Sequence, residues 1–229
     1  MSIQFERSDV SLKKQVIDGM RKAIVEGSFA PGQKLVEREL CGLFDVSRSL
    51  MREVLQQLEA EALITIVPFR GPMVAEILLE EARSIYEVRQ VLEARVGAGC
   101  ARNATGHDIV MLEAALQRIA ECKNSGDQKI LVQAKNEFYD ILMNACGNPV
   151  VKEMLTGLNN RINYLRRLSM SQPGRLDETV KELSAIIEAI RKRDAGLTSR
   201  LCSAHVGKAA EIALQVMQAQ SEKTAVTID

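Results

Sequence analysis

Residues 36–77 hold a short helical pattern, a sharp turn, a longer helical pattern and a hairpin pattern in immediate succession. The segment "VERELCGLF" predicts a short helix, because its apolar residues recur on one face. In the turn "DVS", Asp45 accepts left-handed backbone geometry better than most residues do, and Ser47 can cap a helix that continues to about Ala62. This order predicts a helix-turn-helix.

The flanking segments complete a small domain. "LITIVPFRGPMVAEI" has a β-branched run, a turn and a second extended run, which predicts a hairpin. Before the short helix, a helical apolar pattern predicts another helix, capped by Asp9 or Ser11 and ended by Gly27. A hairpin after a helix-turn-helix makes a wing, so we assign residues 1–76 to a winged helix-turn-helix DNA-binding domain.

Two arginines open the third predicted helix. Arg48 and Arg52 stand four residues apart, so they share one face of its first two turns. The N-terminal end of such a recognition helix enters the major groove, where arginine offers paired donors to guanine. We expect Arg38, from the second helix, and Arg70, from the wing, to join them on double-stranded DNA.

The alternative is that these arginines form ordinary surface ion pairs, for example with Glu53 or Glu59. Lys plus Arg and Asp plus Glu each number 30, so the net charge does not indicate a nucleic-acid partner. Aromatic residues make up only 3% of the chain, which argues against a surface that stacks on bases. The DNA-binding prediction therefore depends on the helix-turn-helix and wing order.

The stretch "AIVEGSFAPGQKLVERELCGLFDVSRSLMREVLQQLEAEALITIVPFRGPMVAEI" resembles the winged helix-turn-helix of the GntR family of bacterial transcription regulators. The motifs E-R-E-L, V-S-R, R-E-x-L-x-x-L-E and R-G carry the resemblance. Matched position by position, they imply that DNA is contacted by Arg38, Ser47, Arg48, Arg52 and Gly71, and we add Ser49 and Arg70 as candidate contacts. The family often has Thr-Pro where Ser49-Leu50 stand and glycine where Asp45 stands, so we expect Leu50 to alter which bases are preferred.

From Leu78 to Gln220 the sequence has helical periodicity with short breaks and no strand pattern. The expected helices are 78–103, 106–124, 127–146, 148–169, 175–193 and 195–220. Six such helices make an antiparallel bundle, whose interior suits a small ligand. We assign residues 77–221 to an all-helical effector-binding and dimerisation domain and 222–229 to a flexible tail. The expected fold class is mainly α.

Three segments, "IYEVRQVLEARVGAGCA", "NEFYDILMNACGNPVV" and "KELSAIIEAIRKRDAGLTSRLCSAHV", resemble the FCD-type (FadR-like) effector domain of one GntR branch. Many members hold a divalent metal with D-x-x-x-H, the histidine of E-H-x-x-I and a last histidine. Here Lys135, Tyr139 and Leu183 stand at three of these positions, and only His205 remains. This set cannot make a strong site for a divalent cation, so we predict no metal and no cofactor.

The replacements suggest how an anion could bind without a metal. We expect Lys135 to supply a fixed positive charge to a small carboxylate effector, with Tyr139 and His205 as hydrogen-bond donors. The alternative is that Lys135 points to solvent and that Tyr139 and Leu183 fill the cavity. The regulator would then sense no small molecule.

Arg89 supports the first alternative, because it lies in the middle of an apolar helical stripe. A buried arginine needs an anion, which is either a side chain such as Glu93 or the carboxylate of a ligand. Arg161 and Asn136 are further candidates for the pocket.

These patterns predict a ligand-responsive transcription regulator that binds a short palindromic operator as a homodimer, since one winged helix makes few base contacts. An enzyme with a helical active site is the rival class. The sequence has no G-x-S-x-G, no P-loop and no nucleophile beside a base, so we predict that the protein is not an enzyme. A scaffold that has lost DNA binding is disfavoured by the arginines of the recognition helix.

The sequence pattern also bears on where the protein is located. It contains no run of about 18 apolar residues, and "MSIQFERSDV" lacks the pattern of a signal peptide. The cysteines number five, without a C-x-x-C pair, and most fall in helical patterns, where cysteine acts as a small buried hydrophobe. We expect a cytoplasmic protein with no membrane partner.

Overall fold

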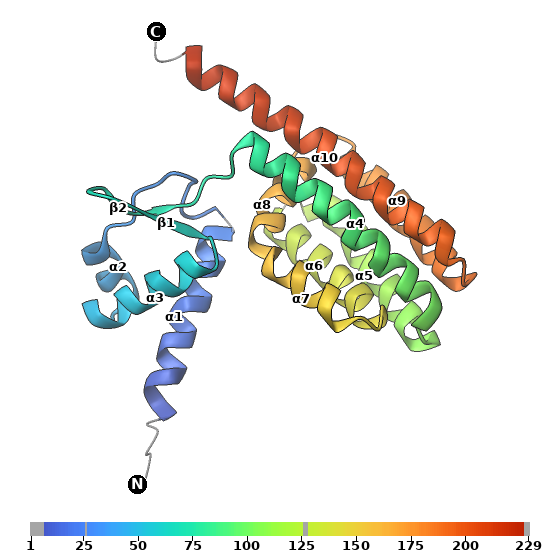
Figure 1. Cartoon of the computed structure of the whole chain (residues 1–229), viewed down its shortest axis with the longest axis horizontal. Helices are drawn as coiled ribbons and strands as arrows, with labels where there is room; N and C mark the ends of the chain where they lie inside the picture. Colours follow the sequence, from blue (N-terminus) through green and yellow to red (C-terminus); the bar gives the residue numbers. More distant parts are fainter. Residues whose placement is uncertain (1–6, 26, 126–127, 227–229) are drawn as a thin grey trace. The chain divides into compact units, whose positions relative to one another are not determined.

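The computed structural model describes residues 7–25, 27–125 and 128–226. The chain divides into two compact units, Met1–Ile77 and Leu78–Asp229 (Figure 1). In the part of the chain that is described, no helix is long and apolar enough to span a lipid bilayer.

The N-terminal unit consists of helices followed by a hairpin. In chain order its elements are α1 (Arg7–Val25), α2 (Glu37–Phe44), α3 (Arg48–Ala60), β1 (Ile64–Val67) and β2 (Gly71–Val74). The strands pair antiparallel, with Ile64 opposite Val74 and Val67 opposite Gly71. The predicted helix-turn-helix and wing are therefore confirmed. The helix α1 begins at Arg7, so the expected caps Asp9 and Ser11 lie inside the helix instead.

Apolar side chains from every element of this unit meet in one core. Its most deeply buried members are Met20, Leu35, Leu40, Met51, Val54, Leu58, Ile64 and Val74. Each contributes roughly 1.5–3 kcal/mol on burial. This core fixes the angle between α2 and α3 and so determines which face of α3 stays exposed.

The turn between α2 and α3 has the predicted geometry. Asp45 adopts a left-handed conformation, with φ of 51°, and its backbone N–H donates to the Cys41 carbonyl. Ser47 caps α3, because its Oγ accepts a hydrogen bond from the Leu50 N–H at 3.2 Å. The chain therefore reverses within a few residues.

The C-terminal unit is helical. Its elements are α4 (Leu79–Asn103), α5 (Gly106–Ser125), α6 (Gln128–Ala145), α7 (Pro149–Gly157), α8 (Asn159–Met170), α9 (Arg175–Arg191) and α10 (Ala195–Val226). The single helix predicted over 148–169 is wrong, because α7 ends at Gly157 and α8 begins at Asn159. Glycine is a poor helix former, which favours a break there. The last helix runs to Val226 and not to 220, so residues 222–226 of the expected tail are helical.

The helices α4 and α10 lie side by side along most of their length (Figure 1). A Cβ atom on Gly97 would lie 2.5 Å from the Cys202 Sγ, and one on Gly207 would lie 2.7 Å from the Gln90 Nε2. Glycine thus allows the two helices to approach closely. On the far side of α4, a Cβ atom on Gly99 would lie 2.5 Å from the carbonyl oxygen of Cys146.

The cysteines behave largely as expected. Cys100, Cys122, Cys146 and Cys202 are buried in the helical unit, whereas Cys41, on α2, is half-buried. Burial raises the pKa of the Cys100 thiol to about 12.

Candidate functional site

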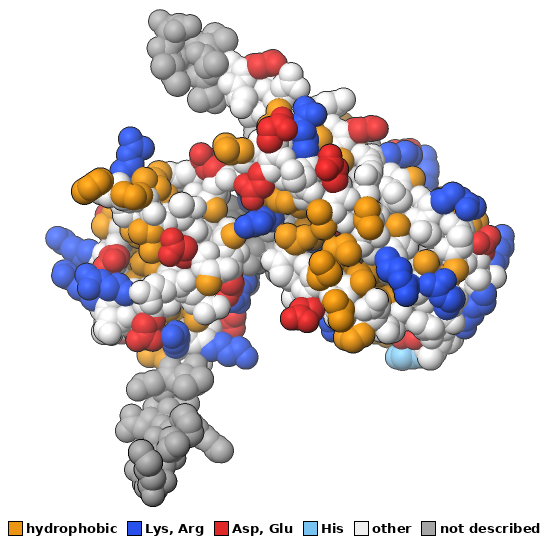
Figure 2. All heavy atoms as spheres, viewed as in Figure 1, with side chains coloured by type: hydrophobic (Ala, Val, Ile, Leu, Met, Phe, Trp, Pro, Cys, Tyr) orange, Lys and Arg blue, Asp and Glu red, His pale blue; other side chains and the backbone are white. Residues whose placement is uncertain are grey.

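The first turns of α3 present a polar surface to solvent. The exposed side chains here are Ser47, Arg48, Ser49 and Arg52, with Arg38 on α2 and Arg70 in the turn of the hairpin. Figure 2 shows Lys and Arg side chains gathered at the end of this unit that carries α2. The side chains predicted to contact DNA are therefore all available to a partner.

Most of these arginines make no ion pair with another described residue. Arg52 Nε lies 3.1 Å from Glu37 Oε2, but the arginine side chain is 67% exposed, so this pair adds little stability. Among the residues that the structure describes, Arg38, Arg48 and Arg70 have no carboxylate within ion-pair distance.

The acids suggested as alternative partners are engaged elsewhere. Glu53 pairs with Lys13 at 2.8 Å, and Glu59 accepts a hydrogen bond from the Ile66 N–H at 3.2 Å. The surface-pair alternative is therefore wrong for Glu53 and Glu59. The first-turn arginine Arg48 makes no ion pair with any described residue.

The wing has two residues with left-handed backbone geometry. Gly71 has φ of 85°, and an added Cβ would contact nothing within 4 Å, so the backbone angle and not crowding requires glycine. Phe69 has φ of 64° although it carries a side chain, and that side chain is fully exposed. A strained, exposed aromatic residue at a wing tip is a candidate DNA contact that the sequence reasoning missed.

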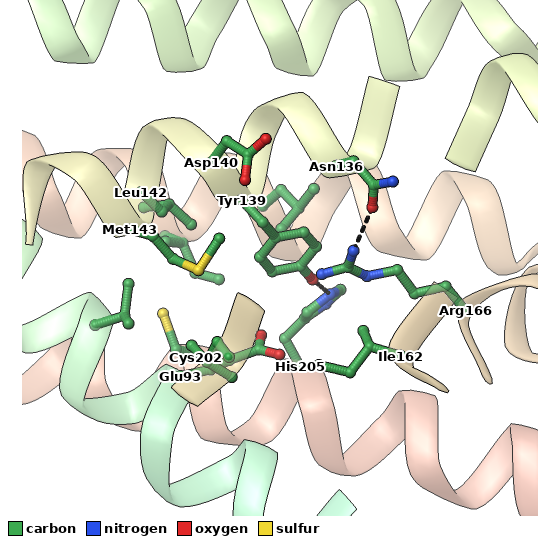
Figure 3. Close-up of a pocket in the computed structure, with 14 residues that line it drawn as sticks. Glu93, Asn136, Tyr139, Asp140, Leu142, Met143, Ile162, Arg166, Cys202 and His205 are labelled. Atoms are coloured by element: carbon green, nitrogen blue, oxygen red, sulfur yellow. Dashed lines mark hydrogen bonds between the residues drawn. The ribbon is translucent and has the colours of Figure 1, made fainter. Parts of the chain in front are cut away.

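A cavity lies inside the helical unit (Figure 3). Its polar lining consists of Glu93, Asn136, Tyr139, Asp140, Arg166 and His205. Its apolar lining consists of Val96, Leu142, Met143, Leu155, Ile162, Leu183, Ile186 and Cys202. The cavity volume is about 20 Å³, which holds a water molecule. A metabolite therefore requires the lining side chains to move.

A second hollow, of about 350 Å³, lies between α5 and α6. It is more open, and its arginine, Arg118, already makes two hydrogen bonds to Glu137, at 3.0 and 2.7 Å. The hollow therefore offers no unpaired cation to an anionic ligand, and the buried cavity is the better candidate site.

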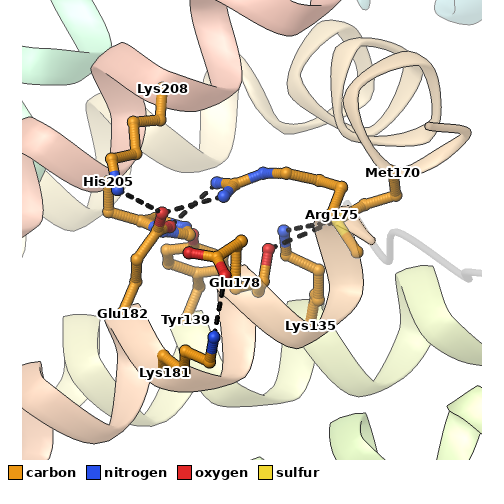
Figure 4. A network of polar contacts seen from close by, with 10 residues as sticks. Lys135, Tyr139, Met170, Arg175, Glu178, Lys181, Glu182, His205 and Lys208 are labelled. Atoms are coloured by element: carbon orange, nitrogen blue, oxygen red, sulfur yellow. Dashed lines mark hydrogen bonds and ion pairs between the residues drawn. The ribbon is translucent and has the colours of Figure 1, made fainter. Parts of the chain in front are cut away.

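A chain of hydrogen bonds borders the cavity (Figure 4). Tyr139 Oη lies 2.8 Å from His205 Nε2, and His205 Nδ1 lies 2.5 Å from Glu182 Oε2. Burial lowers the pKa of His205 to about 4, so the ring is neutral at pH 7. Because the ionised Glu182 can only accept, Nδ1 carries the proton and Nε2 accepts from the Tyr139 hydroxyl.

Two cations lie beside the Glu182 carboxylate. Arg175 donates to both of its oxygens, at 2.8 and 2.9 Å, and Lys208 lies 3.2 Å away. Burial acts to raise the pKa of Glu182, but hydrogen bonds from His205 and Arg175 outweigh burial and lower it. The sequence reasoning missed this pair, although a spacing of seven places Arg175 and Glu182 on one helix face.

Arg89 is buried as predicted, but its anion is a neighbouring side chain. Its Nε and one terminal nitrogen lie 2.9 and 2.8 Å from Glu93 Oε1, and its guanidinium lies over the Tyr86 ring. Burial acts to lower the pKa of Arg89, but the charge of Glu93 raises it above the ordinary value. Of the two anions that the sequence allowed for Arg89, Glu93 and a ligand carboxylate, the structure has Glu93.

Lys135 is only 2% exposed, so the alternative that it points to solvent is wrong. Its Nζ donates to the Met170 thioether at 3.5 Å, and it makes no ion pair within the described part of the chain. Burial and the charges of Arg166 and Arg175 lower its pKa well below the ordinary value. The expected fixed positive charge is therefore disfavoured at Lys135, which also does not line the cavity.

Of the two remaining candidates for the pocket, one lines the cavity and the other does not. Asn136 lines the cavity, whereas Arg161 lies outside its lining, pairs with Glu81 at 3.5 Å and is one-third exposed. Arg161 is therefore better explained as a surface residue.

Arg166, on α8, is the residue that the sequence reasoning missed. It is 5% exposed, and one terminal nitrogen donates to the amide oxygens of Asn136 and Asn163, at 2.5 and 3.2 Å. Its guanidinium carbon lies 4.0 Å from the centre of the Tyr139 ring. Burial lowers its pKa, yet arginine stays charged in proteins. Its spacing from Ile162, four residues earlier, matches the stripe that identified Arg89.

The residues at the metal positions of the FCD-type domain do not fit a metal. Tyr139 and His205 are hydrogen-bonded to each other, Lys135 contacts Met170, and Leu183 is a fully buried hydrocarbon. Among the described residues, no three His, Cys, Asp or Glu side chains are placed to share an ion.

A helix-turn-helix with an exposed basic first turn and a wing defines the N-terminal unit as a winged-helix DNA-binding domain. Residues 12–74 match the family described as bacterial regulatory proteins of the gntR family, and residues 84–208 match the FCD domain. The chain belongs to the GntR family, in the branch with an FCD domain, and is a transcription regulator.

The relatives agree with this assignment. The galactonate operon transcriptional repressor of Escherichia coli (strain K12) is 26% identical over 201 residues, covering 79% of this chain and 87% of that protein. The HTH-type transcriptional repressor RspR of the same strain is 26% identical over 213 residues, covering 92% of each. The solved structure of E. coli McbR/YncC shares the fold, with a TM-score of 0.77 at 20% identity, over 89% of this chain and 97% of that one.

Proposed function

We propose that the protein binds a short palindromic operator as a homodimer and that a small carboxylate inside the helical unit controls this binding. The exposed first turn of α3 carries the DNA proposal. Arg48 there is unpaired among the described residues, and arginine donates two hydrogen bonds to O6 and N7 of guanine. Arg38 and Arg70 extend the basic surface to α2 and the wing.

An apolar surface supports the homodimer. Val88 and Val91 on α4 and Val150 and Met154 on α7 are exposed, and Figure 2 shows hydrophobic side chains gathered on the face that carries these helices. Contiguous exposed apolar surface is typical of interaction sites. Two winged helices related by a twofold axis would bind an inverted repeat. Light scattering tests the proposal, because Val91→Glu should shift a dimer toward monomer.

The balance of buried charge supports a carboxylate effector. Among the described residues, the buried arginine and lysine side chains of the helical unit are Arg89, Lys135, Arg166 and Arg175. Glu93 pairs with Arg89 and Glu182 pairs with Arg175, so Lys135 and Arg166 lack a carboxylate within the described part of the chain. Because a positive charge is disfavoured at Lys135, Arg166 is the unpaired cation of the two. An unpaired buried cation is costly, and an anion would remove that cost. One relative represses the operon for galactonate, which is a carboxylate.

To regulate, the ligand must bind the DNA-competent and the DNA-released forms with different affinity. It should also stabilise the folded protein, by about 2.7 kcal/mol at a hundredfold excess over its dissociation constant. A thermal-shift screen of organic acids tests stabilisation, and fluorescence anisotropy with operator DNA tests control.

The alternative is a regulator that senses no small molecule. The cavity of about 20 Å³ favours it, because Tyr139 and Leu183 already occupy much of the interior. A screen in which no acid raises the melting temperature or changes the affinity for operator would support this alternative and overturn the effector proposal.

A further inference from the structure

The guanidinium of Arg166 has one hydrogen-bonding edge that has no partner among the residues that the structure describes. Arginine offers five N–H donors. One terminal nitrogen serves Asn136 and Asn163, which are neutral, and Nε is buried without a partner among the described residues. A carboxylate binds bidentately to two neighbouring nitrogens, and Nε with the second terminal nitrogen forms such an edge.

The surroundings hold the guanidinium of Arg166 in place beside the cavity. The Tyr139 ring stacks on the guanidinium, and the two asparagines fix its rotation. In Figure 3 the Arg166 side chain reaches into the cavity, with Asn136 on one side of the guanidinium and Ile162 on the other. An arginine held in this way loses little entropy when it binds an anion.

No carboxylate in the described part of the chain makes an ion pair with Arg166. Glu93 lines the same cavity but accepts two donors of Arg89, and Asp140 is exposed and makes no ion pair with Arg166. The partner of Arg166 is therefore better supplied by a ligand than by the protein.

The rest of the lining limits which chemical groups the ligand can carry besides its carboxylate. Its hydrocarbon side chains include Val96, Leu155, Ile162 and Leu183. The Tyr139 hydroxyl and His205 Nε2 are bonded to each other, so they leave little for the hydroxyl groups of a sugar acid. A second carboxylate would meet the negative charge of Glu93.

We propose that Arg166 binds the carboxylate of the effector and that the effector is a small monocarboxylic acid with an apolar body. This assignment rests on the proposed function of the helical unit as an effector domain. Because the cavity volume is about 20 Å³, the body of the acid displaces lining side chains. Met143 lines the cavity, and its unbranched side chain can change rotamer to make room.

Isothermal titration calorimetry and thermal shift on the full chain test the proposal. The probes are pentanoate and benzoate, with pentanamide as the uncharged analogue of the first, succinate as a dicarboxylate and gluconate as a sugar acid. Wild type should bind pentanoate or benzoate, and should bind pentanamide, succinate and gluconate at least about tenfold more weakly.

The variants are Arg166→Met, Arg166→Lys, which keeps the charge without the planar edge, and Arg161→Met, an arginine outside the lining. Both changes at Arg166 should weaken the binding of the favoured acid at least about tenfold, and Arg161→Met should not. Circular dichroism and operator affinity without acid establish that each variant is folded. If Arg166→Met does not fold, Arg166→Lys and the comparison of pentanoate with pentanamide in wild type still test whether Arg166 binds the carboxylate.

The outcomes separate the two proposals. If no acid binds wild type, the effector function itself fails. If pentanoate or benzoate binds wild type and both Arg166 variants equally, only the assignment of Arg166 is overturned. If succinate or gluconate binds more tightly than both monocarboxylates, the proposed ligand class is overturned.

Discussion

The Tyr139 hydroxyl lies 2.8 Å from Nε2 of His205, so two residues at positions that hold a metal in related domains are hydrogen-bonded to each other. The opposite ring nitrogen of His205 contacts Glu182, which Arg175 also binds. The imidazole is therefore fixed between an acceptor and a donor as a neutral ring. In this arrangement the ring forms part of the cavity wall.

This neutral ring predicts a loss of stability in acid. Burial lowers the pKa of His205 from 6.5 to about 4, so between those values the unfolded chain binds the proton and the folded chain does not. The free energy of unfolding should fall by roughly 3 kcal/mol as the pH drops from about 6.5 to about 4. Urea unfolding at several pH values measures it. His205→Gln should flatten this dependence, whereas His107→Gln, at an exposed position, should not.

Arg48→Ala should weaken binding to the specific operator by about 1–3 kcal/mol, because it removes donors to a base edge. Fluorescence anisotropy on operator and scrambled duplexes at fixed salt measures the change, with Arg95→Ala, on α4, as the control. An equal loss on both duplexes would mean that Arg48 contacts only phosphate.

Phe69→Gly should lower the affinity for operator DNA without lowering the stability of the fold. The left-handed backbone at Phe69 costs about 1 kcal/mol or more, and the exposed ring buries nothing in return. We expect the free energy of unfolding to stay the same or rise by up to about 1 kcal/mol, while operator affinity falls. Denaturant titration and anisotropy supply the two measurements. Unchanged affinity would show that the wing tip does not reach DNA.

Gly99→Ala should destabilise the helical unit by about 1–3 kcal/mol, because the new Cβ would lie 2.5 Å from the backbone carbonyl of Cys146. Gly157→Ala is the matched control, since nothing lies within 4 Å of its Cβ position. That change should be neutral or stabilising by up to about 1 kcal/mol. Similar losses in both variants, measured by urea unfolding, would contradict the packing argument.

Chelation should leave the melting temperature unchanged, because a bound ion can shift it only by mass action and the residues at the metal positions do not fit one. Elemental analysis of purified protein checks the same point. One zinc or nickel per chain would refute it.

Most of the N-terminal fold was predictable, since local chemistry determines it. Asp45 and Ser47 specify the turn and the cap through their own backbone and side-chain preferences. The break at Leu158 was harder to predict. The apolar pattern runs through both α7 and α8, and only the glycine before Leu158 signals the interruption.

The cavity was predicted less well than the fold. Arg89 was correctly placed in the interior, but the sequence could not decide between Glu93 and a ligand as its partner, because that choice depends on a side-chain rotamer. Arg166 carried the same signal as Arg89, a charge in an apolar stripe. It was missed because its asparagine partners include one from another helix, Asn136.

The burial of the cysteines has a practical consequence. With the Cys100, Cys122, Cys146 and Cys202 thiols enclosed in the helical unit, a thiol-reactive dye added to the folded protein should modify Cys41 first. Cys41 lies on α2, and its carbonyl accepts the backbone N–H of Asp45 in the turn. The native chain thus carries a labelling position beside its recognition helix, and a dye there would report on that helix without any engineered cysteine.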